Sequence, residues 1–180
     1  MDDPITLSVN LSPRQVHHPN IVRDVADALE DSGLAANRLV LEITENVLMT
    51  DTAATLSRLF QLKALGLRLA VDDFGTGYSS FAYLRRFPVD IIKIDKSFIE
   101  GIATEPTAAA LAEAMIRIAK ALNLETVAEG VERSEQADRL RALQCEIGQG
   151  FLFSRPLPAE AMTASLRDGT IGGASRAHAA

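Results

Sequence analysis

Hydrophobic and polar positions alternate along the chain in two recurring patterns. Short runs rich in β-branched residues predict strands, and most are followed by a longer stretch in which apolar residues recur every three or four positions, which predicts a helix. The predicted strands are Thr6–Asn10, Arg38–Ile43, Leu69–Val71, Asp90–Asp95, Glu125–Glu129 and Gly148–Phe153. The predicted helices are Asn20–Asp31, Thr52–Leu65, Phe81–Arg86, Thr107–Leu122, Ser134–Leu143 and Pro158–Arg167.

This alternation predicts an α/β fold with a mostly parallel sheet. Because polar residues stand where the strands end, we expect an incomplete (β/α) barrel of the TIM type, with about six βα units and its active site at the carboxyl ends of the strands. A complete barrel has eight strands and about 250 residues, and this chain of 180 residues is about two units shorter. We expect the missing units to precede the first strand.

The helical periodicity also predicts which side chains face the core. In the helix Thr52–Leu65 the residues expected to point inward are Leu56, Leu59, Phe60 and Leu62. The chain ends in glycine, alanine and serine residues without periodicity. We therefore expect one barrel domain over residues 1–167 and a flexible tail over residues 168–180.

Composition narrows the class of protein. With 47% hydrophobic and 23% charged residues the chain is typical of a globular domain, and its net charge of −6 argues against binding a DNA or RNA polymer. The single cysteine, Cys145, allows no intrachain disulfide and is expected to be a small buried residue. No apolar run is long enough for a membrane span, and the Met1–Pro4 start does not resemble a signal peptide, so we expect a cytoplasmic protein without membrane insertion.

The third predicted strand ends at two adjacent carboxylates, Asp72 and Asp73. A strand as apolar as Leu69–Val71 is expected to be buried on both faces, as in parallel sheets, which bind ligands beyond the carboxyl ends of their strands. Two neighbouring acids at that place need counter-charge, and hard divalent cations supply it through oxygen ligands. The sequence therefore predicts a metal site there, whereas an isolated Asp-Asp pair would more often be a solvated turn.

Polar residues stand at the ends of the other predicted strands as well. Together with the two aspartates, the set is Asn10, Glu42, Asp72, Asp73, Lys93, Asp95, Glu129 and Gln149. Each residue alone would suit a turn or the surface, but their shared place predicts that they converge at one mouth of a barrel. Carboxylate and amide oxygens without histidine or cysteine favour Mg²⁺ or Mn²⁺ over zinc.

Six segments carry a more specific signal. They are Asn10-Leu11-Ser12, Leu41-Glu42-Ile43-Thr44-Glu45, Asp72-Asp73-Phe74-Gly75-Thr76-Gly77-Tyr78-Ser79-Ser80, Lys93-Ile94-Asp95, Ala128-Glu129-Gly130-Val131-Glu132 and Gln149-Gly150-Phe151. In order and spacing they resemble the EAL domain family, over nearly everything from about Leu7 to Pro158. The resemblance implies a modified (β/α) barrel and a bacterial cyclic di-GMP phosphodiesterase, a hydrolase that opens one phosphodiester bond to give linear pGpG.

The resemblance also implies a two-metal site that takes Mg²⁺ or Mn²⁺. By position, Asn10, Glu42 and Asp72 match ligands of one ion. Asp73 matches the holder of the second ion, with Asp72 bridging the two.

Other residues match positions that act on the attacking water or support the site. Lys93 and Glu129 match the residues that orient or deprotonate the water. Asp95 and Gln149 resemble supporting residues, and Glu45 matches the acid that anchors the loop after Asp73. These roles rest on the resemblance alone.

The chain departs from the family at one place. No Glu-x-Leu segment precedes Asn10, so the family's glutamate ligand on an early strand and a nearby arginine that contacts the substrate have no counterpart. We expect weak metal affinity and little turnover from the chain as written.

Other functions and partners stay open. Degenerate members of the family serve as non-catalytic cyclic di-GMP receptors or interaction modules, and an unrelated magnesium-dependent barrel lyase could carry a similar acidic set. The resemblance further implies a possible homodimer through the helices that flank the Asp72-Asp73 loop, and GGDEF or sensor domains in a full-length protein.

Overall fold

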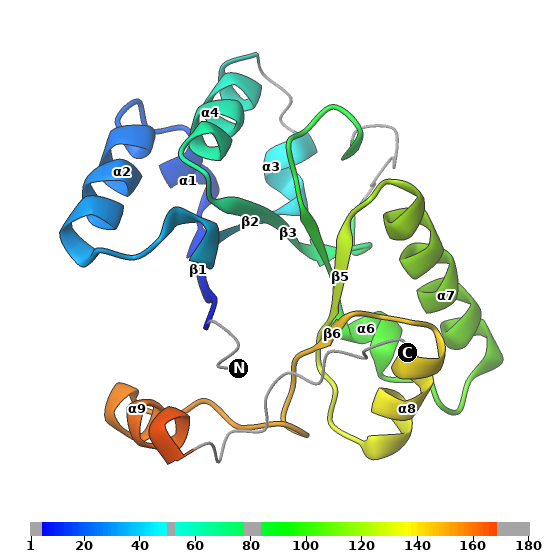
Figure 1. Ribbon diagram of the computed structural model, residues 1–180. Helices are drawn as coiled ribbons and strands as arrows, with labels where there is room; N and C mark the ends of the chain where they lie inside the picture. Colours follow the sequence, from blue (N-terminus) through cyan, green and yellow to red (C-terminus); the bar gives the residue numbers. More distant parts are fainter. Residues whose placement is uncertain (1–4, 50–52, 78–83, 169–180) are drawn as a thin grey trace. The chain divides into compact units, whose positions relative to one another are not determined.

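The computed structural model describes residues 5–49, 53–77 and 84–168. It divides the chain into two compact units, Met1–Ile92 and Lys93–Ala180, and strand β4 (Ile91–Ile94) contributes residues to both. Six strands form one sheet in the order β1-β2-β3-β4-β5-β6, and described helices lie between successive strands everywhere except between β3 and β4 (Figure 1). Strands in sequence order joined through helices are the connectivity of a (β/α) barrel, so the predicted fold class is confirmed.

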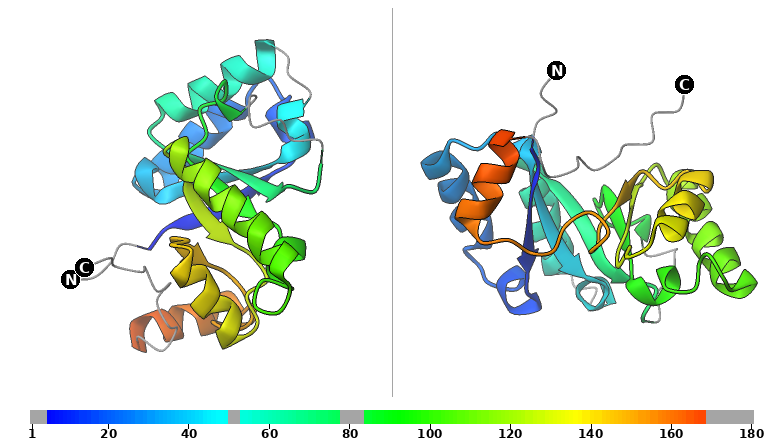
Figure 2. Two further views of the ribbon diagram at one scale, coloured as in Figure 1. Left: turned by 90° about the vertical axis from the view of Figure 1, so that its right-hand side faces the viewer. Right: turned by 90° about the horizontal axis from the view of Figure 1, so that it is seen from below.

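The first unit holds the strands β1 (Leu7–Leu11), β2 (Leu39–Thr44) and β3 (Arg68–Phe74). Its helices are α1 (Pro13–Val16), α2 (Ile21–Ser32), α3 (Glu45–Met49) and α4 (Ala53–Ala64), and a 3₁₀ turn, Ala36–Arg38, leads into β2. β2 pairs in parallel with both β1 and β3. The helices α2 and α4 pack side by side, as the views in Figures 1 and 2 show.

The apolar strand patterns are explained by burial. In β2 every residue from Leu39 to Ile43 is buried, and Leu69, Ala70 and Val71 of β3 are 0–1% exposed. Because both faces of these central strands are covered, their sequences are continuous apolar runs and do not alternate with polar residues. The glutamate within β2, Glu42, is buried with its neighbours.

The second unit begins within β4 and adds β5 (Glu125–Ala128) and β6 (Ile147–Gly148). Its helices are α6 (Lys96–Ile99), α7 (Pro106–Ala121), α8 (Ser134–Ala142) and α9 (Ala159–Asp168). α7 packs against both α6 and β5 (Figure 2). Cys145 is buried, as predicted, and burial raises the pKa of its thiol.

No helix in the described parts of the chain combines the length and the apolar character needed to cross a membrane.

Several details of the prediction are wrong. The sixth strand is only Ile147–Gly148, because the chain turns at once and the amide of Phe153 donates to the carbonyl of Gly150. In α4 Phe60 is 53% exposed, and Thr55, at 0%, takes a place in the core with Leu59 and Leu62. These three follow the spacing i, i+4 and i+7 of one helix face, from which Phe60 is rotated by about 100°.

The short helices α1, α3 and α6 were not predicted either. Half of the predicted helix Phe81–Arg86, residues 81–83, lies outside the described residues. The predicted tail does too, except that Asp168 ends α9.

An ion pair within the first unit, between Lys63 and Asp90, gives a stability prediction. Lys63 Nζ lies 2.8 Å from both carboxylate oxygens of Asp90, and one of these oxygens also accepts a hydrogen bond from the Leu69 amide of β3 at 2.8 Å. Asp90→Ala would leave a half-buried ammonium and a strand amide without this partner. We expect the free energy of unfolding to fall by about 2 kcal/mol in urea titrations.

The matched control is Asp138→Ala, because Asp138 is 72% exposed and pairs with Arg141 on the surface of α8. We expect this loss to stay below about 0.5 kcal/mol. Equal losses for the two variants would contradict a stabilising role for the Lys63–Asp90 pair.

Candidate active site

Three of the predicted metal ligands share one face of the sheet in the first unit. Asn10 of β1 is the register partner of Glu42 of β2, and Glu42 is the partner of Ala70 of β3. Register partners in parallel strands project to the same side, and side chains return to that side every second residue. Asp72, two residues beyond Ala70, therefore points to the same face as Asn10 and Glu42. Glu42 is only 8% exposed.

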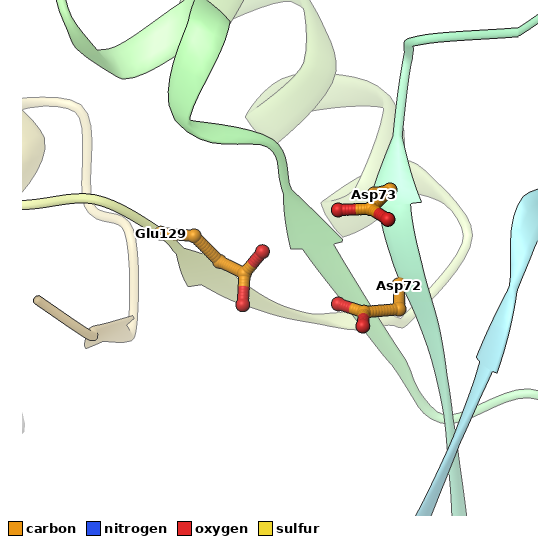
Figure 3. A group of neighbouring side chains, drawn as sticks. All are labelled: Asp72, Asp73 and Glu129. Atoms are coloured by element: carbon orange, nitrogen blue, oxygen red, sulfur yellow. The ribbon is translucent and has the colours of Figure 1, made fainter. Parts of the chain in front are cut away.

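Asp73 departs from the regular strand. Its φ is 52°, in the left-handed region that aspartate tolerates better than most residues. Adjacent residues of a regular strand project to opposite sides, but this backbone angle interrupts the alternation. Figure 3 shows the carboxylates of Asp72 and Asp73 on the same side of β3. The pair can therefore present oxygens to one ligand or to two neighbouring ions.

Glu45 lies directly after β2, as the first residue of α3, and is 5% exposed. Its Oε2 accepts a hydrogen bond from the Gly75 amide at 3.1 Å. Its Oε1 is buried and has no hydrogen-bond partner among the described residues. A Cβ on Gly77 would lie 2.5 Å from that oxygen. Glu45 thus contacts the segment that follows Asp73, and a side chain at Gly77 would require its carboxylate to shift.

Lys93 and Glu129 form a close ion pair in the second unit. Lys93 belongs to β4, Glu129 follows β5 directly, and Lys93 Nζ lies 2.7 Å from Glu129 Oε1. The side chains are 6% and 17% exposed. The Glu129 amide donates to the carbonyl of Ile94 at 3.0 Å, which ties the residue to the end of β4. Figure 3 shows the Glu129 carboxylate beyond the end of β5.

Asp95 serves as the N-cap of α6. Its side chain accepts a hydrogen bond from the Ser97 amide at 3.0 Å. Although partial burial acts to raise the pKa of Asp95, hydrogen bonds from Ser97 together with the amide and charge of Lys96 outweigh it and lower that pKa below its usual value. The aspartate is therefore a helix cap in the segment that carries Lys93.

Gln149 follows β6 and is exposed. Its amide donates to the Ala128 carbonyl at 2.8 Å, and its carbonyl accepts from the Val131 amide at 3.0 Å. Through its backbone it therefore borders the segment after Glu129.

Gly130 has a steric role in this segment that sequence reasoning did not assign. Its φ is +68°, and an added Cβ would lie 2.5 Å from the Cβ of Lys96. The signal in the sequence is a glycine that directly follows an acid at a strand end. Gly130→Ala is expected to lower the free energy of unfolding by about 3 kcal/mol in urea titrations, from backbone strain and overlap together.

Gly33→Ala is the control for this prediction, because Gly33 has a φ of +66° and open space around its Cβ position. That variant should lose only about 1 kcal/mol, the cost of the backbone angle alone. Losses of the same size at both glycines would show that the Lys96 contact has no effect.

Comparisons with known proteins show which family this chain belongs to. The family model "EAL domain" matches residues 1–156. The cyclic di-GMP phosphodiesterase NbdA of Pseudomonas aeruginosa is 46% identical over 163 residues, which are 91% of this chain and 21% of that protein. The chain spans about a fifth of the length of this and other curated relatives that it matches.

Solved structures of related proteins have the same fold as this chain. A structure described as the PaMucR phosphodiesterase in complex with c-di-GMP is 44% identical, with a TM-score of 0.82 over 87% of this chain and 64% of that one. Klebsiella pneumoniae BlrP1, solved with manganese and cyclic di-GMP, is 37% identical, with a TM-score of 0.78 over 84% of this chain and 39% of that one. The protein therefore belongs to the EAL domain family.

Proposed function

We propose that this chain hydrolyses cyclic di-GMP to linear pGpG with the help of divalent cations. Membership of the EAL family and the phosphodiesterases among its relatives support this class of reaction. The observation that carries the proposal is the joint presence of the Asp72–Asp73 carboxylates on one side of β3 and the buried Lys93–Glu129 pair. Each group stands at the carboxyl end of its strand, which is where parallel sheets bind ligands.

The residues fit a hard divalent cation. Asn10, Glu42 and Asp72 present amide and carboxylate oxygens on one face of the sheet, and this donor set suits Mg²⁺ or Mn²⁺. Asp73 adds a further carboxylate oxygen beside Asp72, on the same side of β3. Bound cations would lower the pKa of a water molecule and neutralise charge on the phosphate.

Residues of the chain would accept the proton that the attacking water releases. Glu129 is the general base that accepts a proton from the attacking water, whose oxygen forms a bond to phosphorus. The bond from phosphorus to the sugar oxygen breaks, and that oxygen leaves with the electron pair and takes up a proton from solvent. Lys93, 2.7 Å from Glu129, holds that carboxylate in place and orients the water. Burial of the pair strengthens this interaction, because few water molecules screen it.

The test is an incubation of the 180-residue chain, in excess over cyclic di-GMP, with and without Mn²⁺, so that slow hydrolysis is detected. We expect pGpG to form with Mn²⁺ and not after chelation with EDTA. If cyclic di-GMP stays intact with Mn²⁺ or Mg²⁺, the enzymatic proposal is wrong.

Calorimetric titration of cyclic di-GMP separates the enzyme from a receptor. Strict dependence of binding on the metal favours the enzyme, because the cations would hold the phosphates. Tight binding without metal and without turnover favours a receptor.

A further inference from the structure

Gln136 is a buried amide for which the proposed reaction gives no direct role. It is the third residue of α8 and is 2% exposed. Its Oε1 accepts hydrogen bonds from the amides of Glu132 and Arg133, both at 2.9 Å. Its Nε2 donates to the carbonyls of Ile99 at 3.1 Å and Glu100 at 3.3 Å. Both ends of the side-chain amide are therefore engaged.

These four hydrogen bonds join two segments that carry site residues. Ile99 ends α6, which begins directly after Asp95 and follows the strand that carries Lys93. Glu132 lies three residues beyond Glu129, in the connection from β5 to α8. One side chain thus links the segment after Lys93 to the segment after Glu129. Only a group with both donors and acceptors can make this link, because each segment offers a different kind of backbone group.

The connection from Glu129 to Arg133 has further hydrogen bonds besides those of Gln136. The Glu129 amide is bonded to Ile94 and the Val131 amide to Gln149. Arg133 donates to the Glu100 carbonyl at 2.7 Å from an exposed position. Gln136 is a buried link between the Arg133 end of this connection and the end of α6.

We propose that Gln136 is a positioning residue that acts through the segment Glu129–Arg133 to hold the Glu129 carboxylate against Lys93. The proposal deepens the phosphodiesterase function and, for its effect on catalysis, rests on it. Gln136 does not touch the substrate or the reacting atoms. It fixes the backbone on which the general base is mounted, and small displacements of such a group reduce rates strongly.

A helix cap is the competing explanation, and the geometry separates the two. Gln136 also caps α8 by accepting from the backbone amide of Arg133, the N-cap residue. Capping uses only the oxygen, and a glutamate at this position of a helix caps equally well. The donors on Nε2 serve only the link to Ile99 and Glu100. Gln136→Glu therefore keeps the cap and loses the link, whereas Gln136→Met loses both with little change in volume.

The first measurement is amide hydrogen exchange by NMR in the 180-residue chain. The reporters are the amides of Glu129 and Val131, which bond to other residues than Gln136. We expect exchange to be about tenfold faster in Gln136→Glu and Gln136→Met. Gln144→Glu, at an exposed position after α8, is the matched control and should match the parent chain. Parent-like exchange in Gln136→Glu would reduce the residue to a helix cap and overturn the proposal.

The second measurement is kinetic, at a temperature where circular dichroism shows every variant folded. We expect kcat of Gln136→Glu to fall about tenfold while KM changes less than about twofold, because the base is displaced and the substrate contacts remain. An unchanged kcat would contradict positioning. If neither the parent chain nor Gln144→Glu hydrolyses cyclic di-GMP, the phosphodiesterase function fails, and amide exchange still decides whether Gln136 holds the segment.

Discussion

Replacing Glu129 with glutamine is expected to lower the rate of cyclic di-GMP hydrolysis by about a thousandfold. The amide keeps the shape of the carboxylate but cannot accept a proton from water, so the loss should fall on the chemical step. Single-turnover rates measured with the chain in excess, together with calorimetric affinity for cyclic di-GMP, would separate chemistry from binding. We expect the affinity to change by less than about threefold.

The control for this prediction is Glu135→Gln, which makes the same chemical change at an exposed position in the first turn of α8. Its rate should equal that of the parent chain. A Glu129→Gln variant that retains more than about a tenth of the parent rate would exclude Glu129 as the general base.

Asp72→Asn is expected to have the second large effect. Asp72 lies on the sheet face that also presents Asn10 and Glu42, and it adjoins Asp73. We therefore propose its carboxylate as a metal ligand. The neutral amide is a weaker ligand. We expect the Mn²⁺ concentration for half-maximal hydrolysis to rise by about 100-fold, measured by titrating the assay with MnCl₂.

Asp138→Asn, on the surface of α8, tests whether any loss of a negative charge produces this effect. It should leave the Mn²⁺ dependence unchanged. If Asp72→Asn also titrates like the parent chain, Asp72 is not a metal ligand.

The sequence predicted the fold class well because two strong signals coincide. Buried strands such as β2 read as continuous apolar runs, and the helices between them are long enough to show their periodicity. The sixth strand misled the prediction because Phe151, Leu152 and Phe153 form an apolar run like a strand. In the structure Phe151 is 51% exposed, and the guanidinium of Arg155 lies 4.5 Å from the centre of its ring.

The three short helices escaped prediction for a reason of length. α1, α3 and α6 have four or five residues each, too few for a periodic pattern. A capping signal was present for α1, because Ser12 and Gln15 form a capping box. A capping residue was present for α6 as well, because Asp95, which was predicted to support the site, is its N-cap.

The candidate site shows what sequence alone cannot supply. Motif positions indicated which residues to examine, but the register that aligns Asn10 with Glu42 depends on strand pairing. The left-handed backbone of Asp73 and the close approach of Gly130 to Lys96 depend on tertiary contacts. Gln136 has no sequence signal beyond a polar residue near a helix start, because its role depends on two segments that are distant in the chain.

Binding of Mn²⁺ to the chain without substrate, followed by electron paramagnetic resonance, tests the central claim most directly, since it asks whether these carboxylates hold a cation. We predict that the parent chain binds Mn²⁺ and that Asp72→Asn and Asp73→Asn each weaken binding by at least about tenfold, while Asp138→Asn does not. Equal Mn²⁺ affinity in all four proteins would contradict the account.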